Sequence, residues 1–270
     1  MNELPIVYTR SNEEMIVCTE GVEQMDDYTK KVEQEVLIWK KKMTKPSNLI
    51  SRVSKSAQTK INGLLPEKFH NVMTESIKNM VKATLVGSNI TFKKRTSTEM
   101  SLSERDELFK EKLALFRKTA TIEGAGTGAG GILLGIADFP LLLSIKMKFL
   151  FEAAAVYGFD TNDPEERRFI LHVFLLAFSS EEKRKETLFI IENWEQQKAL
   201  VANMDWREFQ QEYRDYIDLV KMFQMLPGIG AVVGAFANYN LLDQLGESAM
   251  NSYRLRLLQN KKRELTQDGF

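Results

Sequence analysis

The clearest chemical motif in the sequence is a glycine cluster near its centre. Gly126-Thr-Gly128-Ala-Gly-Gly131 has the spacing of the G-x-G-x-x-G loop that holds a dinucleotide pyrophosphate. That loop works between a β-strand and the start of a helix, but residues 113–122 have a helical pattern. The G-x-x-x-x-G-K-[ST] loop of NTPases is absent as well. We therefore predict no nucleotide cofactor.

Histidine and cysteine, which supply many nucleophiles and metal ligands, are scarce in this chain. His70 lies in a basic helical segment, and His172 lies in an apolar run, where a buried histidine with one hydrogen-bond partner is the ordinary outcome. Neither has the spacing of a metal site, no G-x-S-x-G motif occurs, and the single Cys18 has no basic neighbour. We predict no catalytic residue, metal or cofactor, and an enzymatic role is not favoured.

Three polar residues, Glu123, Asp138 and Asn238, lie inside apolar helical stretches. A buried acid or amide must find a hydrogen-bond partner or change its protonation state. Arg254 and Arg256 are candidates for the balancing charge. Two interpretations remain open for this candidate cluster: a buried network that fixes the helices in register, or a functional polar pocket.

Glycines in the two apolar runs, residues 123–140 and 222–242, recur four positions apart. This spacing leaves one helix face without side chains, so that helix backbones can approach closely. At an offset of one hundred residues the runs align, which favours either a duplicated helical hairpin or a chance likeness. The predicted helix-packing glycines are Gly124, Gly126, Gly128, Gly130, Gly131, Gly135, Gly228, Gly230 and Gly234.

Both runs approach the length of a membrane span, about 20 apolar residues. Asp138 and Pro140 interrupt the first run, and the second contains Gln224, Asn238 and Asn240, which are costly in lipid. Three alternatives remain: true spans, hairpins buried in the core, and hairpins that are buried in solution but can meet lipid. Of these we favour buried hairpins.

Apolar residues recur at helical spacing along most of the chain, and no segment alternates like a strand. Asp163-Pro164 predicts a helix start, Ser103 with Asp106 resembles a capping box, and Gly158 fits a left-handed helix end. We predict an all-α compact bundle of about nine or ten helices with two glycine-rich apolar hairpins at its centre. An acidic, loosely ordered extension (1–25) is expected to precede one helical domain (26–266), made of basic N-terminal helices (26–95) and a hairpin core (103–265).

Charge is unevenly distributed, although the net charge is zero. Residues 28–95 carry fifteen Lys or Arg and four Glu, whereas residues 1–27 carry seven acidic residues and one Arg. The basic block indicates either a solvated helical face or a surface for an anionic membrane. Without interleaved exposed aromatics it predicts no nucleic-acid partner. The candidate membrane-surface residues are Lys40, Lys41, Lys42, Lys45, Arg52 and Lys55.

Three stretches together resemble the EcsC family of bacterial proteins. They are Glu123-Gly-Ala-Gly-Thr-Gly-Ala-Gly-Gly with Ala137-Asp138-Phe-Pro; Tyr157-Gly-Phe-Asp through Asp163-Pro164-Glu-Glu; and Pro227-x-Ile-Gly230 through Asn238-Tyr, with Asp243-x-Leu-Gly-Glu and Tyr253-Arg254. The resemblance covers residues 25–262 and identifies the helical domain as EcsC-like. It implies an association with an ABC transporter, because founding members are encoded beside transporter subunits in a system tied to protein secretion. It implies no catalytic residues.

The sequence thus predicts a non-enzymatic cytoplasmic protein that acts at the inner face of the membrane. The single cysteine and the acidic start of the chain, unlike a secretory signal, favour the cytoplasm. Its role is predicted as an accessory of an Ecs-type ABC transporter or as direct lipid contact, so the expected partners are a membrane surface, a lipid or transporter subunits. The alternative is an enzyme or binding protein for a lipid-like substrate held between the glycine-rich hairpins. The oligomeric state is left open.

Overall fold

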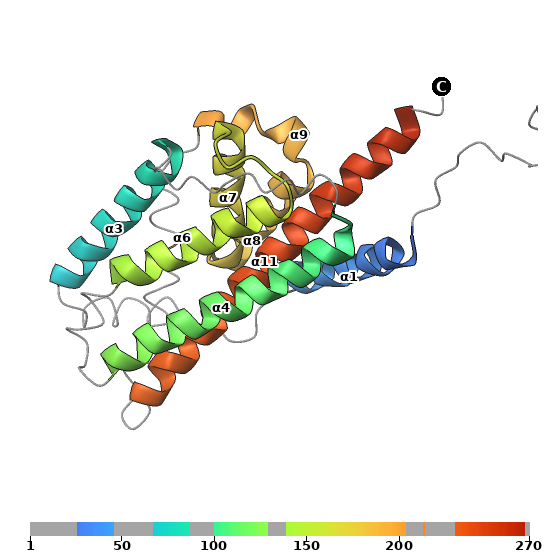
Figure 1. Ribbon diagram of the computed structural model, residues 1–270. Helices are drawn as coiled ribbons and strands as arrows, with labels where there is room; N and C mark the ends of the chain where they lie inside the picture. Colours follow the sequence, from blue (N-terminus) through green and yellow to red (C-terminus); the bar gives the residue numbers. More distant parts are fainter. Residues whose placement is uncertain are drawn as a thin grey trace, which may run out of the picture.

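The computed structural model describes residues 26–45, 67–86, 100–128, 139–203, 213 and 230–267, and every regular element in these ranges is helical (Figure 1). The all-α prediction is confirmed for this part of the chain. The expected count of nine or ten helices is not confirmed, since eight α-helices and one 3₁₀ helix lie in the described ranges. They are α1 (Asp27–Thr44), α3 (Glu67–Val86), α4 (Leu102–Gly128), α6 (Phe139–Val156), α7 (Pro164–Ala177), α8 (Glu181–Glu192), α9 (Trp194–Gln197), η2 (Leu200–Asn203) and α11 (Gly230–Gln267).

Two of the predicted helix ends are confirmed. The Asp163 carboxylate accepts a hydrogen bond from the Glu165 backbone N–H at 2.8 Å, and Pro164 occupies the first turn of α7, where its missing N–H costs nothing. Gly158 ends the segment after α6 with φ of 91°, a left-handed conformation that other residues adopt only with strain.

The predicted capping box of Ser103 and Asp106 is wrong. The box lies two residues earlier, where the Ser101 hydroxyl accepts from the Glu104 backbone N–H at 3.3 Å and the Glu104 carboxylate accepts from the Ser101 backbone N–H at 2.7 Å. Asp106 cannot cap the helix because its side chain is fully buried among other helices.

Two long helices, α4 and α11, lie side by side and organise the remaining elements (Figure 1). The 38 residues of α11 give a helix about 57 Å long. Besides α4, this helix contacts α1, α6, α7 and α8. Side chains on α11 can therefore contact several other helices at once.

The glycine-rich runs are described only in part. Gly124, Gly126 and Gly128 lie in the last turns of α4, and Gly230 and Gly234 lie in the first turns of α11. Helices α4 and α6 are antiparallel neighbours, since Phe116 packs on Phe149 and the earlier Phe109 packs on Tyr157, the residue that follows α6. Residues 129–138, which join them and contain Gly130, Gly131, Gly135 and Asp138, lie outside the described residues, as does Gly228. The two glycine-rich hairpins therefore stay a prediction.

An aromatic cluster forms the centre of the described core. Tyr157 stacks on Tyr253 of α11, with ring centroids 5.5 Å apart and planes 14° apart. Phe169 of α7 packs on Tyr253 from another side, and on the indole of Trp194. Helix α7 is buried nearly all round, as its continuous apolar sequence indicates. No helix in the described ranges combines the length and the apolar character needed to cross a membrane.

His172 on α7 is a buried core histidine, as predicted. Its Nδ1 lies 2.8 Å from the Arg168 carbonyl oxygen, and its Nε2 has no hydrogen-bond partner among the described residues. Burial, with a smaller contribution from the nearby cations Lys183 and Arg168, lowers the pKa of His172 to about 4. The imidazole is therefore neutral in the folded protein at neutral pH.

This lowered pKa makes stability depend on pH. The unfolded chain binds a proton at His172 near pH 6.5 and the folded chain only near pH 4, so acidification between these values favours unfolding. Between pH 7.5 and pH 5 we expect wild type to lose about 2 kcal/mol more unfolding free energy than His172→Gln. Urea unfolding at both pH values measures this difference. Equal losses in the two proteins would show that His172 is not the titrating group.

Candidate functional site

Asp106 on α4 lies at the centre of a buried charged network. Its carboxylate accepts hydrogen bonds from the hydroxyls of Tyr157 at 2.6 Å and Tyr28 at 2.7 Å. The Arg254 guanidinium on α11 donates from Nη2 at 2.7 Å and from Nε at 2.9 Å. Asp106 is 0% exposed and Arg254 is 2% exposed, so both charges are removed from water and compensate each other.

The Asp106 carboxylate changes the pKa values of the neighbouring titratable groups. Burial and the hydrogen bond to Asp106 raise the pKa of Tyr28 to about 12, and the same causes raise the pKa of Tyr157 well above 10. Burial alone would lower the pKa of Arg254, but the hydrogen bonds to Asp106 raise it overall. Both tyrosines are thus hydrogen-bond donors throughout the physiological range. The network joins α1, α4, α11 and the turn after α6.

A second buried network lies on the opposite side of α11. The Glu166 carboxylate on α7 accepts from the Tyr253 hydroxyl at 2.7 Å and from Arg256 Nη1 at 2.5 Å. The Arg256 guanidinium also lies 4.1 Å from the ring centre of Phe159 and 4.5 Å from that of Phe169, as a cation–π contact requires. Burial raises the pKa of Glu166 despite these partners.

These networks are closed, and they change the predicted role of two arginines. Arg254 and Arg256 pair with Asp106 and Glu166 rather than with the predicted Glu123, Asp138 and Asn238. Glu123 and Asn238 lie on the helical backbones of α4 and α11, but their side chains, like all of Asp138, are outside the described residues, so that cluster stays a prediction. Both carboxylates are buried and paired with an arginine of α11, so the arrangement is suited to fixing the helices relative to one another.

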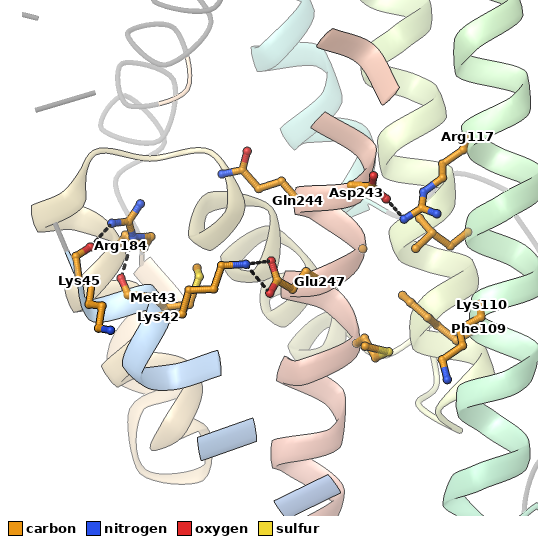
Figure 2. Close-up of a pocket in the computed structure, with 13 residues that line it drawn as sticks. Lys42, Met43, Lys45, Phe109, Lys110, Arg117, Arg184, Asp243, Gln244 and Glu247 are labelled. Atoms are coloured by element: carbon orange, nitrogen blue, oxygen red, sulfur yellow. Dashed lines mark hydrogen bonds and ion pairs between the residues drawn. The ribbon is translucent and has the colours of Figure 1, made fainter. Parts of the chain in front are cut away.

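An open pocket of about 830 Å³ lies between α1, α4, α8 and α11 (Figure 2). Five α11 residues line it: Asp243, Gly246, Glu247 and Met250, which lie at helical spacing along the floor, and Gln244 beside them. Helix α4 supplies one wall and the C-terminal end of α1 the other. Its volume falls within the range of about 300–1,000 Å³ that is typical of small-molecule sites.

Cations outnumber anions around this pocket. Five basic side chains (Lys42, Lys45, Lys110, Arg117 and Arg184) face two acidic ones (Asp243 and Glu247), which leaves a net charge of +3. Figure 2 shows the Lys42 ammonium reaching from α1 to the Glu247 carboxylate on α11, at 2.7 Å and 2.8 Å. Arg117 pairs with Asp243 on the α4 side.

Arg184 of α8 fixes the end of α1 beside the pocket. It donates from Nε to the Met43 carbonyl at 2.9 Å and from Nη2 to the Lys45 carbonyl at 3.2 Å. A cation at a helix C-terminus satisfies carbonyls that lack partners within the helix and offsets the negative end of the helix dipole. Lys42 and Lys45 are thereby held at the pocket.

Gly246 gives the pocket floor its shape. A Cβ atom at this position would lie 2.7 Å and 2.8 Å from the two δ-carbons of Leu113 on α4. Only glycine lets Leu113 lie this close to the α11 backbone without moving. Among the glycines whose contacts the structure describes, Gly246 is the one that allows close packing. It is an isolated glycine and does not belong to the two runs from which helix-packing glycines were predicted.

Helix α1 is amphipathic, but the face that it turns to solvent is not wholly polar. Val32, Val36, Trp39 and Met43 point into the core, while the opposite face exposes two aliphatic residues: Leu37 is 50% exposed and Ile38 is 68% exposed. Three exposed lysines lie on the same face: Lys30 and Lys31 two turns before these aliphatics, and Lys41 one turn after them. We call these five residues, Lys30, Lys31, Leu37, Ile38 and Lys41, the outer α1 face.

The predicted membrane-surface residues divide between three places. Lys41 lies on the outer α1 face, Lys42 and Lys45 line the pocket, and Lys40 forms an ion pair of 2.7 Å with Glu192 of α8. Arg52 and Lys55 lie outside the described residues. The list of predicted membrane-surface residues did not include Lys30, Lys31, Leu37 and Ile38. The spacing of two aliphatic residues opposite an apolar stripe is nevertheless visible in the sequence.

Comparison with known proteins gives the family. The profile of the EcsC protein family matches residues 30–258. The chain belongs to the EcsC protein family. It is 56% identical to Protein EcsC of Bacillus subtilis (strain 168) over 225 residues, which cover 83% of this chain and 94% of that protein. It is 28% identical to the Uncharacterized protein YdbA of the same strain over 276 aligned positions, which cover 91% of this chain and 97% of that protein. No solved structure matches the chain.

The region matched by the EcsC family contains the pocket and both buried networks except Tyr28. Asp106, Glu166 and Arg254 all lie within residues 30–258, as do Leu37 and Ile38. The resemblance to the EcsC family is thus confirmed over most of the chain.

Proposed function

We propose that this EcsC-family chain is a cytoplasmic, non-enzymatic protein that binds the inner face of the cell membrane and serves there as an accessory of an Ecs-type ABC transporter. The observation that carries the proposal is the outer α1 face, where Leu37 and Ile38 stand exposed among lysines. Exposed aliphatics within a basic helical face are typical of helices that lie in the interface of an anionic bilayer.

The charges on this face are available for such contact. Lys30 pairs with Asp27 at 3.3 Å and Lys31 lies 3.8 Å from Glu35, but both pairs are exposed to solvent. Exposed pairs of this kind contribute little to stability, so anionic lipids can compete for the lysines. Each lysine near an anionic leaflet contributes about 1 kcal/mol, and buried aliphatic side chains add to this.

Vesicle sedimentation tests the membrane half of the proposal. The full chain is expected to sediment with phosphatidylglycerol-containing vesicles at low salt and to remain in the supernatant with pure phosphatidylcholine vesicles. Because the Debye length falls to about 3 Å at 1 M salt, high salt is expected to release much of the bound protein. Equal binding to both vesicle types, or no binding at low salt, would contradict the proposal.

The second part of the proposal, the role as an accessory of an ABC transporter, rests on the association that membership of the EcsC family implies. Affinity purification of the tagged chain from detergent-solubilised membranes is expected to recover subunits of an ABC transporter. Recovery that is no greater than with an unrelated tagged cytoplasmic protein would contradict this half and leave lipid contact as the whole role.

A further inference from the structure

We propose that the pocket between α1, α4 and α11 binds an anionic amphiphile, a single acyl or alkyl chain that ends in a phosphate or carboxylate group. This inference goes beyond membrane contact, because the pocket lies beside the outer α1 face rather than on it and would take its ligand in solution as well. It also differs from a site between the glycine-rich hairpins, since its floor and walls come from residues 42–45, 109–117, 184 and 243–250.

The apolar part of the pocket suits a hydrocarbon chain. Met43, Phe109, Leu113 and Met250 line it from three different helices. Gly246 has no side chain, and Leu113 occupies the space beside it, so the Leu113 side chain lies directly against the α11 backbone at the floor. A largely apolar wall with a few convergent polar groups is the usual composition of a ligand site.

The charged part of the pocket suits an anion. Lys45, the residue after α1, and Lys110 on α4 line the pocket. Both are exposed, and neither forms an ion pair in the described parts of the chain. Lys42 adds a third ammonium group. It forms an ion pair with Glu247 at the surface, where the Lys42 side chain is 64% exposed. A surface pair is easily exchanged, so a ligand headgroup can replace Glu247 as the partner of Lys42.

The charge balance decides between a neutral and an anionic ligand. A net charge of +3 around one cavity raises the local concentration of anions and disfavours cations. A neutral lipid would leave this field uncompensated, and a bare anion would leave the apolar wall in contact with water. A ligand that is anionic at one end and apolar at the other satisfies both.

Isothermal titration calorimetry with three matched probes tests the proposal without vesicles. Decyl phosphate, used as monomers, has the headgroup and the chain; decanol has the chain alone; inorganic phosphate has the headgroup alone. We expect saturable binding of decyl phosphate at one site, at least ten-fold tighter than either of the other probes. Equal affinity for decanol would overturn the role of the cations, and equal affinity for inorganic phosphate would reduce the pocket to a site for small anions.

Two variants place the binding in this pocket. Lys45→Glu with Lys110→Glu is expected to weaken decyl phosphate binding at least ten-fold, whereas the control Lys82→Glu with Lys148→Glu, which makes the same charge change at exposed lysines elsewhere, is expected to leave it within two-fold. Met250→Gln keeps the size of the side chain but makes the floor polar, and it is expected to weaken decyl phosphate and leave phosphate unchanged. Wild-type affinity in both pocket variants would overturn the proposal. Because no membrane is present, this result is separate from the outcome of the vesicle experiment.

Discussion

Replacing Asp106 with alanine is expected to lower the free energy of unfolding by about 3–5 kcal/mol, the range measured when one partner of a buried ion pair is removed. Among the described residues, the change would leave the Arg254 guanidinium, 2% exposed, with Glu35 as its one carboxylate partner. It would also remove the acceptor for the hydroxyls of Tyr157 and Tyr28. Urea unfolding monitored by circular dichroism measures the loss.

Two controls separate the buried charge from other effects. Glu35→Gln removes the other carboxylate that pairs with Arg254, but Glu35 is 42% exposed, so this variant is expected to lose no more than about 1 kcal/mol. The double variant Asp106→Leu with Arg254→Met removes both charges, and it is expected to be more stable than Asp106→Ala. A loss below 1 kcal/mol in Asp106→Ala, or a double variant as unstable as the single one, would contradict the assignment.

Reversing three charges on the outer α1 face is expected to abolish binding to anionic vesicles. At about 1 kcal/mol per lysine, the variant Lys30→Glu, Lys31→Glu, Lys41→Glu loses the attraction of three lysines and gains repulsion, so its vesicle affinity should fall at least 100-fold. The side chains are exposed, so the fold should be unaffected. Co-sedimentation with phosphatidylglycerol vesicles provides the affinity.

Matched variants elsewhere on the surface show whether position matters or only net charge. Lys82→Glu, Lys118→Glu, Lys148→Glu makes the same change in net charge at exposed lysines outside the outer α1 face, and it should keep most of the binding. For the aliphatic contribution, Leu37→Ser with Ile38→Ser is compared with Leu115→Ser on α4, where Leu115 is 59% exposed. Similar losses in the two lysine triples would mean that binding depends on net charge alone.

The sequence predicted local features of the fold well, because the signals for them lie within a few residues. The Asp163-Pro164 start of α7 and the Gly158 helix end each depend on one turn of chain, and both are confirmed. The position of His172 in the core followed from an apolar run on every side. By contrast, Ser103 and Asp106 matched a capping pattern that the fold places two residues earlier, since a longer-range partner holds Asp106.

The buried networks could not be predicted, because their partners are far apart in sequence. Asp106 and Arg254 are separated by 148 residues, and Glu166 and Arg256 by 90. A signal was nevertheless present: Asp106 falls at helical spacing from Phe109 and Leu113, so a charged residue lies on an apolar helix face. The pocket has no comparable signal, because it exists only once the ends and faces of α1, α4 and α11 are brought together.

A fluorophore on the outer α1 face tests the membrane contact most directly. Cys18 is the only cysteine, so Cys18→Ser with Ile38→Cys allows a single environment-sensitive label at position 38, and Cys18→Ser with Leu115→Cys gives the matched control on α4. With phosphatidylglycerol vesicles, we predict a blue-shifted emission and protection from an aqueous quencher at position 38, and neither effect at position 115. Sedimentation of the protein with the vesicles while the label at position 38 stays in water would contradict the account.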